Sequence, residues 1–117
     1  MRERFHYDGT LFFPDIEEKR SRMESVAASH RASLYFSTGL VELRYIGRDT
    51  GRWYWEFLSE LAEVIGDAEG EIVCEIPDDE KDDPDFEFFS IAGGKLYIEN
   101  GMIVRSNKRP VAADISK

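Results

Sequence analysis

The stretch from residue 52 to residue 65 constrains the fold most, because it carries the strongest helical periodicity in the chain. With successive residues placed 100° apart, its large apolar side chains fall within one broad arc and its glutamates lie on the other side. Gly66 suits the end of such a helix, and Asp49 or Thr50 suits its capped start. The apolar arc, which we predict to face the core, consists of Trp53, Tyr54, Phe57, Leu58, Leu61, Val64 and Ile65.

One residue of this stretch departs from the pattern. Trp55 falls on the polar side of the predicted helix, beside Glu56, Ser59 and Glu63. A large aromatic residue among charges is typical of an anchor in a protein interface. Two other interpretations stay open: Trp55 covers the edge of the core, or residues 52–57 form the second strand of a hairpin. We predict the helix.

A second helix and a hairpin are predicted in the first half of the chain. Pro14 begins a polar, helix-prone stretch in which Asp15 can cap the first turn. A thin apolar stripe along this stretch indicates a surface helix over residues 15–31. Two runs of alternating residues flank the turn sequence Ser-Thr-Gly at 37–39, which predicts a β-hairpin over residues 32–47.

Strands dominate the remainder of the chain. Residues 4–13 predict one strand or a short hairpin. Residues 71–76 predict a short strand whose apolar phase includes Cys74. Alternating runs flank Asn-Gly at 100–101, and this dipeptide is the strongest short-range hairpin signal. We therefore predict an antiparallel meander over residues 85–106.

This order of elements predicts an α+β fold, in which a mainly antiparallel sheet carries two helices on one face. The first six elements follow the βαββαβ order of ferredoxin-like domains, and a C-terminal β-meander is added to them. A chain of 117 residues is long enough for one domain with a substantial core. We predict a single domain over residues 1–107 and a polar C-terminal tail over residues 108–117.

Composition predicts a soluble, cytoplasmic protein. Cys74 is the only cysteine, so the chain forms no internal disulfide. The N-terminal residues are charged and lack the apolar region of a signal peptide. No run approaches the roughly 20 apolar residues that span a membrane.

Negative charge is concentrated in one block of the chain. Residues 53–104 carry fifteen acids and two lysines, whereas residues 1–52 carry nine Lys or Arg and eight acids. A field of this sign repels nucleic acid and anionic lipid, and it attracts basic proteins or cations. We therefore expect no nucleic-acid or membrane partner.

No stretch of the sequence carries a catalytic or cofactor motif. The acidic run from Asp78 lacks the glycine and glutamate that an EF-hand calcium loop needs at its sixth and twelfth positions. His6, His30 and Cys74 lack the paired spacing of a zinc site. The glycines fit turns and no phosphate-binding loop. We expect no metal, no cofactor and no enzymatic activity; the enzymatic alternative is Cys74 activated by one of the histidines.

The acidic block supports our leading hypothesis. A small acidic protein can neutralise a basic protein partner, because complementary charges raise association rates. The concrete version is an immunity or antitoxin-like protein that blocks the active site of a toxin such as a nuclease, with carboxylates in place of substrate phosphates. The predicted partner-binding residues are Trp55, Glu56, Glu60, Glu63, Asp78, Asp79, Glu80, Asp82, Asp83 and Asp85.

Three other interpretations of the sequence stay open. The acidic block is a plain solvated face, which is the commonest meaning of a charge run. The protein is a non-catalytic accessory or assembly domain that forms a homodimer through a sheet edge or through the meander. The acidic run binds cations weakly, without a defined geometry.

Overall fold

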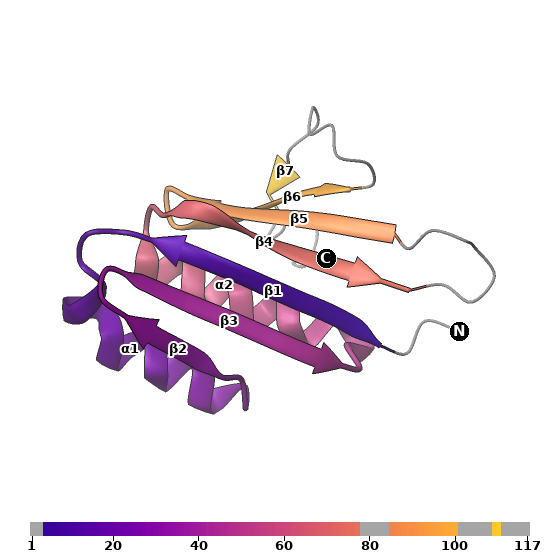
Figure 1. Cartoon of the computed structure of the whole chain (residues 1–117), viewed down its shortest axis with the longest axis horizontal. Helices are drawn as coiled ribbons and strands as arrows, with labels where there is room; N and C mark the ends of the chain where they lie inside the picture. Colours follow the sequence, from indigo (N-terminus) through magenta and orange to yellow (C-terminus); the bar gives the residue numbers. More distant parts are fainter. Residues whose placement is uncertain (1–3, 78–84, 101–108, 111–117) are drawn as a thin grey trace.

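The structure, a computed structural model of the chain, describes residues 4–77, 85–100 and 109–110. Strands and helices alternate along the first half, and strands alone follow the second long helix (Figure 1). The elements are β1 (Phe5–Phe12), α1 (Ile16–Ser29), β2 (Leu34–Ser37), β3 (Leu40–Gly47), the short 3-10 helix η1 (Thr50–Arg52), α2 (Trp53–Ile65), β4 (Glu69–Ile76), β5 (Asp85–Ala92), β6 (Lys95–Asn100) and β7 (Arg109–Pro110).

The described strands form one antiparallel sheet in the order β2-β3-β1-β4-β5-β6-β7. β1 lies between β3 and β4, so strands that are far apart in the sequence become neighbours. In this register, Asp8 of β1 lies opposite Arg44 of β3 and Val73 of β4. The predicted α+β class and mainly antiparallel sheet are confirmed. The ferredoxin-like plan rests on element order alone and stays a prediction.

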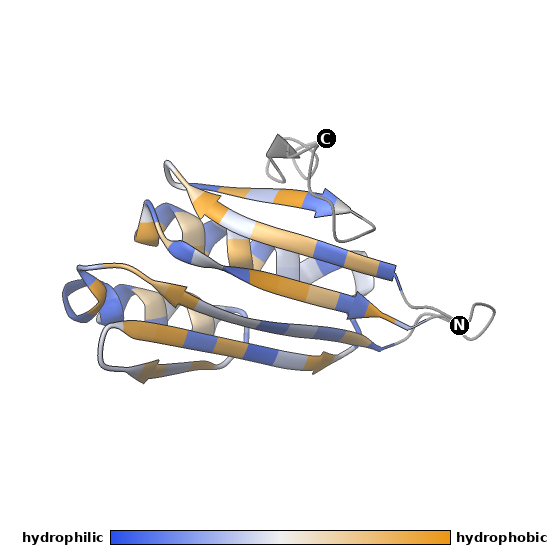
Figure 2. Ribbon diagram, turned by 45° about the horizontal axis from the view of Figure 1, so that its top comes forward, coloured by the Kyte–Doolittle hydropathy of each residue, from blue (hydrophilic) through white to orange (hydrophobic). Residues whose placement is uncertain are grey.

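Both long helices lie against the same face of the sheet, as predicted (Figure 1). The strands alternate between apolar and polar residues, and this alternation is visible as changing colours along each ribbon in Figure 2. The apolar positions turn toward the helices because burial of apolar surface is the main favourable term in folding. The largest fully buried side chains are Tyr7, Tyr54, Phe57, Phe89, Leu11, Met23, Leu43, Leu58, Leu61, Ile65, Ile72 and Leu96.

A glycine in the middle of β1 allows the central strands to pack closely. Gly9 lies opposite Leu43 of β3 and Ile72 of β4. A Cβ atom at Gly9 would stand 2.7 Å from Ile72 Cγ1 and 2.8 Å from Ile72 Cα, which is closer than real Cβ contacts. The close approach of β1 and β4 therefore requires glycine at this position.

The helix predicted between residues 52 and 65 is present, and the alternative strand at residues 52–57 is wrong. α2 begins at Trp53 after the 3-10 turn η1. The Asp49 carboxylate accepts a hydrogen bond from the Tyr54 amide at 2.9 Å, so Asp49 satisfies a free N–H group in the first turn, as predicted. Gly66 ends the helix with φ of 84°, a conformation that glycine adopts without strain.

The other predictions for the first half hold with small corrections. The hairpin of β2 and β3 turns at residues 38–39, and α1 follows Pro14. Within residues 4–13, predicted as one strand or a short hairpin, Phe5–Phe12 form the single strand β1. Asp15 stands at the N-terminal cap of α1, but its side chain makes no capping hydrogen bond. β4 begins at Glu69, two residues before the predicted strand, because its pairing with β1 extends to that end.

The C-terminal part matches the predicted meander in its first hairpin. β5 and β6 pair around Gly93-Gly94, and β6 pairs in turn with β7. The predicted Asn-Gly turn and the strand after it include residues 101–106, which lie outside the described residues. β7, at Arg109–Pro110, falls inside the predicted polar tail and is paired with Tyr97 and Ile98.

None of the helices in the described part of the chain is both long and apolar enough to cross a membrane.

Candidate partner-binding surface

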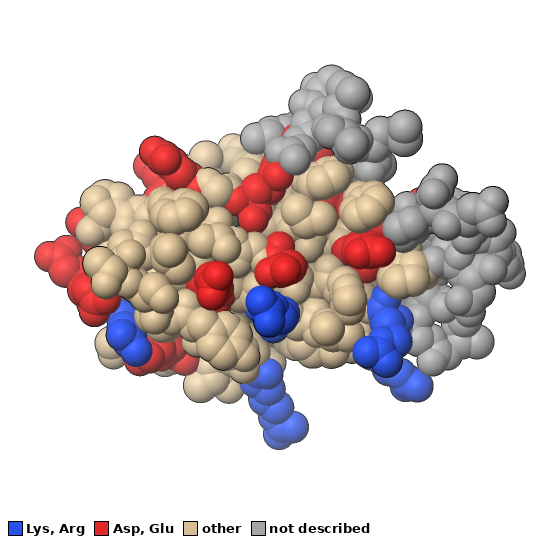
Figure 3. All heavy atoms as spheres, in the orientation of Figure 1, with Lys and Arg blue, Asp and Glu red and all other residues tan. Residues whose placement is uncertain are grey.

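The side of the sheet that faces away from the helices is an open surface. Side chains that alternate with the buried ones along β1, β3, β4 and β5 point to this side and are exposed or half-exposed. Acidic side chains are spread across the surface, and the basic ones lie mainly toward its lower margin (Figure 3). We call it the open sheet face; its members on these four strands are His6, Asp8, Thr10, Phe12, Leu40, Glu42, Arg44, Ile46, Glu69, Glu71, Val73, Glu75, Phe86, Phe88, Ser90 and Ala92.

A hollow of about 520 Å³ lies on the open sheet face over β1 and β4. The residues that line the hollow are paired across the two strands, because the register places His6 opposite Glu75 and Thr10 opposite Glu71. Asp8 and Val73 form the pair between them. The full lining is His6, Asp8, Gly9, Thr10, Glu71, Val73, Glu75 and Phe86. Three carboxylates therefore border one small depression.

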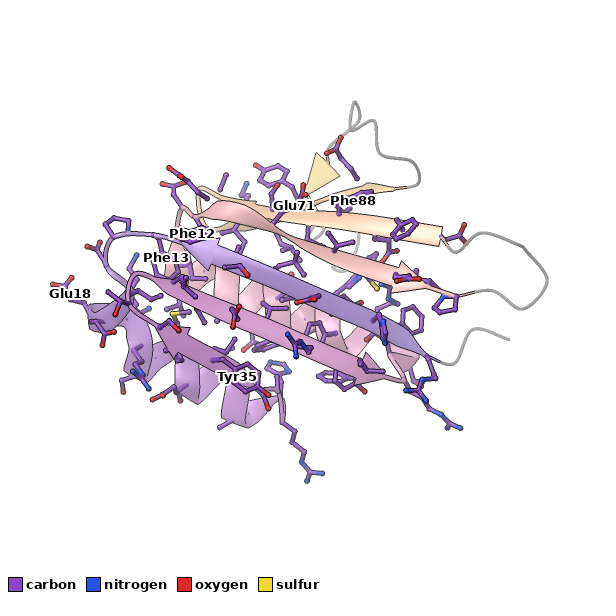
Figure 4. The ribbon with its side chains drawn as sticks, in the orientation of Figure 1. Phe12, Phe13, Glu18, Tyr35, Glu71 and Phe88 are labelled. Atoms are coloured by element: carbon purple, nitrogen blue, oxygen red, sulfur yellow. The ribbon has the colours of Figure 1, made fainter. Side chains whose placement is uncertain are left out.

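Phe86 of β5 lines the hollow, and Phe88 of the same strand stacks against its ring. Phe86 lies opposite Glu75, and Phe88 lies opposite Val73. The two phenyl rings are stacked, with their centroids 6.1 Å apart. Figure 4 labels Phe88 on β5 and Glu71 on the neighbouring strand β4. Carboxylates beside an aromatic surface suit a Lys or Arg side chain, because the cation can pair with the carboxylates while its stem and charge contact the ring.

Positive charge is scarce on the strands that build the hollow. Arg44 of β3, which lies opposite Asp8, is the only Lys or Arg in β1, β3, β4 and β5. Asp8 and Glu75 have no ion-pair partner within the described residues. Within these described strands a single arginine can offset Asp8 and Glu75, so the two carboxylates give the hollow a negative field that attracts a basic ligand.

The predicted glutamates of α2 lie on the other side of the molecule from this hollow. Glu56, Glu60 and Glu63 are exposed on the helix, whose buried side faces the sheet. Glu60 is 3.0 Å from the Nε2 atom of His30 at the end of α1. The structure therefore does not bring these glutamates together with the carboxylates of the open sheet face.

Trp55 is half-buried between the helix and the sheet. Its ring lies 4.1 Å from the Arg52 guanidinium and 6.0 Å from the Phe89 ring. Its indole N–H is buried and has no hydrogen-bond partner among the described residues. Trp55 thus covers an edge of the core, which was one of the interpretations left open, and its role as an anchor for a partner stays a prediction.

The predicted acidic loop lies almost entirely outside the described residues. Asp85 is described: it begins β5, lies opposite Ile76 and is half-buried. The predicted residues of the loop for which nothing structural can be stated are Asp78, Asp79, Glu80, Asp82 and Asp83.

A buried polar cluster, which the sequence did not reveal, joins the start of α2 to the sheet. Arg52 donates to both carboxylate oxygens of Glu87, at 2.6 and 3.1 Å, and to the Tyr7 hydroxyl at 2.9 Å. It also donates to Asp49 at 2.9 Å, and the Tyr7 hydroxyl donates to the same carboxylate at 2.5 Å. The Asp49 side chain is fully buried, and that of Glu87 is 12% exposed. We call these four residues the buried cluster.

The pKa values in the buried cluster follow from burial and from these contacts. Burial raises the pKa of the Tyr7 hydroxyl, and its neighbours Cys74 and Asp49 raise it further. For Arg52, burial acts to lower the pKa, but the hydrogen bonds to Glu87 outweigh it and the pKa is raised. Arg52 therefore keeps its charge in the folded protein.

Cys74 lies beside the buried cluster, opposite Tyr7 and Glu87. Burial, followed by the nearby Glu87 carboxylate, raises the pKa of its thiol to about 12. The thiol is thus protonated at neutral pH, whereas a nucleophilic cysteine needs a lowered pKa. His6 lies on the open sheet face and His30 at the end of α1, so the predicted enzymatic alternative of a Cys–His pair is not assembled.

Two signals in the sequence point to the buried cluster in retrospect. Glu87 occupies the apolar phase of β5, together with Phe89 and Ile91, and a carboxylate at such a position needs a buried partner. Asp49 stands shortly before the predicted helix, where an acidic side chain can accept hydrogen bonds from free amides. Arg52 carries no such signal, because its role depends on its αL backbone, with φ of 57°, and on strands distant in the sequence.

Metal binding finds no support in the described part of the chain, where no three His, Cys, Asp or Glu side chains are placed to hold an ion. Comparisons of the chain with protein-family models, with curated proteins and with solved structures found no match.

Proposed function

We propose that this protein binds a basic protein partner through its open sheet face and inhibits that partner, in the manner of an immunity or antitoxin-like protein. The hollow over β1 and β4 carries the proposal, because three carboxylates and an aromatic ring border it while the strands around it carry a single arginine. A Lys or Arg side chain of the partner would occupy the hollow.

Inhibition follows from the chemistry of such a partner. An enzyme that acts on nucleic acid presents a positively charged cleft, since it must bind phosphates. Carboxylates held on a rigid sheet can take the place of those phosphates. Such an encounter is fast at low ionic strength and is weakened by salt, because the attraction is electrostatic and screened.

The acidic residues outside the hollow would also attract a basic partner. Glu56, Glu60, Glu63 and the run from Asp78 to Asp85 would add to the negative field that steers a basic partner, even where they do not touch it. Trp55 would contribute only if its half-buried ring becomes part of an interface. These residues would attract the partner over a distance, whereas the hollow would bind one of its side chains directly.

A defined basic probe tests the binding surface before any partner is known. The full chain is titrated with a hexa-arginine peptide while backbone amide signals are followed by NMR at low and high salt. We expect the largest shifts at the hollow, and we expect salt to weaken binding.

A matched pair of variants locates the interaction. The test variant replaces the hollow carboxylates (Asp8→Asn, Glu71→Gln, Glu75→Gln). The control makes the same change in net charge on α1 (Glu17→Gln, Glu18→Gln, Glu24→Gln). The test variant should bind the peptide about tenfold more weakly, a loss of about 1.4 kcal/mol, and the control about as well as wild type. Equal losses in both variants would refute the assignment to the hollow.

Inhibition is tested with the natural partner. A tagged wild-type chain, the hollow variant and a loop variant (Asp78, Asp79, Asp82 and Asp83 each changed to Asn) are used to purify partners from the source cells. We expect a basic protein that the wild type retains, that the hollow variant loses, and whose activity the wild type suppresses. A retained protein whose activity is unchanged would refute inhibition while leaving the binding surface intact.

A further inference from the structure

The two edges of the sheet differ in what covers them. β6, near one edge, is paired with β7, whose two residues are Arg109 and Pro110. β2 forms the other edge and pairs only with β3 among the described strands. Figure 1 shows β2 at the lower margin of the sheet, next to α1. Among the described residues, no strand pairs with the outer side of β2.

β2 is a short strand of four residues, but it lacks the charged residues and prolines that commonly protect exposed edges. Natural sheets guard their edges with charged residues, with proline or with bulges, because an unpaired strand can pair with another chain. Residues 33–39, which contain β2 and its turn, include no charge and no proline. Tyr35 is 55% exposed, the largest value among the exposed large hydrophobic residues (Figure 4). Leu34 and Phe36 are half-buried and extend the core to this edge.

We propose that β2 pairs with β2 of a second copy of this chain, so that the two sheets join across a two-fold axis. The partner is a second copy because of where the charges lie. Residues 16–47 carry five Lys or Arg and four acids, whereas residues 53–104 carry fifteen acids and two lysines. Two copies of this acidic protein therefore repel each other less when they meet at β2 than when they meet through residues 53–104.

The backbone of β2 can also pair with the same strand of a second copy. A two-fold axis runs the two β2 strands antiparallel, so each supplies the backbone groups that the other lacks. The strand itself carries no carboxylate, so it attracts a basic partner less than the open sheet face does. The open sheet face stays uncovered in this arrangement, so the dimer and the proposed binding of a basic partner do not depend on each other.

The size of the full chain in solution tests the dimer. Sedimentation equilibrium is measured over a range of protein concentrations, at low and high salt, for wild type, Tyr35→Lys and Ile46→Lys. The last is a matched control, because Ile46 is 46% exposed on the neighbouring strand and the charge change is the same. We expect twice the monomer mass for wild type and Ile46→Lys at high concentration, with little effect of salt.

Lysine at position 35 places two positive charges near each other across the proposed axis. Like charges in facing strands are unfavourable, so the dissociation constant of the Tyr35→Lys dimer should rise about tenfold or more. Ser37→Lys, at an exposed position at the end of β2, provides a second variant if circular dichroism shows that Tyr35→Lys is unfolded.

Three outcomes would overturn the proposal. Wild type that stays monomeric at the highest concentration has no β2 pairing. Equal weakening by Tyr35→Lys and Ile46→Lys would place the contact elsewhere. A mass that grows beyond the dimer would show a head-to-tail contact between unlike surfaces, because a two-fold contact closes at two copies.

Discussion

The two faces of the central strands hold polar groups in opposite states. On the helix side of β1 and β5, Tyr7 and Glu87 belong to the buried cluster, and each meets a partner within the chain. On the open side of β1 and β4, Asp8 and Glu75 border a hollow and face solvent. Both sets of side chains belong to the same group of paired strands. The face of the strand on which a charged side chain lies therefore decides its role. On the helix side the charge is paired within the protein, and on the open side it stays available to a ligand.

Removal of the arginine of the buried cluster should produce the largest effect on stability. Arg52→Met leaves two buried carboxylates, Asp49 and Glu87, without their cation. We expect the free energy of unfolding to fall by about 3 kcal/mol, because an uncompensated buried charge is strongly destabilising. Urea unfolding measures the change. Arg44→Met on the open sheet face is the control and should stay within about 0.5 kcal/mol of wild type; similar losses in both variants would erase the contrast between the faces.

The same substitution on the two faces should separate folding from binding. Asp49→Asn removes the charge that accepts hydrogen bonds from Tyr7, Arg52 and the Tyr54 amide, so the free energy of unfolding should fall by about 2 kcal/mol. Asp8→Asn is expected to change stability by less than about 0.5 kcal/mol and to weaken binding of the hexa-arginine peptide. The contrast would fail if Asp49→Asn were as stable as wild type.

Thiol chemistry should distinguish the faces in the folded protein. Cys74 is buried and its pKa is raised to about 12, so we expect no alkylation by iodoacetamide at neutral pH. A cysteine at the neighbouring position 73 points to the open sheet face, so Val73→Cys combined with Cys74→Ala should react readily. Mass spectrometry of the native proteins counts the modified thiols. Rapid modification of Cys74 would show that the helix side of the strands is open to reagents.

The raised thiol pKa also predicts a pH dependence of stability. The unfolded chain loses the Cys74 proton near pH 9, whereas the folded chain holds it until about pH 12. Stability is therefore complete below pH 9 and falls as pH rises between these values, by at most about 1.4 kcal/mol per pH unit for this group. Urea midpoints should fall more steeply in wild type than in Cys74→Ala. Parallel slopes in the two proteins would contradict the raised pKa.

Sequence alone predicted the elements because their signals are local. The alternation around residues 37–39 and the apolar arc of α2 both depend on which side of a strand or helix must be buried, a property of neighbouring residues. The α+β class followed from the order of the elements. Asp49 and Gly66 marked the ends of α2 for the same reason, since capping involves groups within a few residues.

Only the tertiary structure decided which residues share a site. β1 lies between β3 and β4, and that pairing alone sets Asp8 near Glu71 and Glu75 in one hollow. Likewise, no local pattern joins Tyr7, Arg52 and Glu87, which come from three parts of the chain. The predicted partner-binding residues were chosen by their density in the sequence, and α2 carries three of them to the other side of the sheet. Strand order is set by long-range pairing, and a single sequence does not record which strands pair.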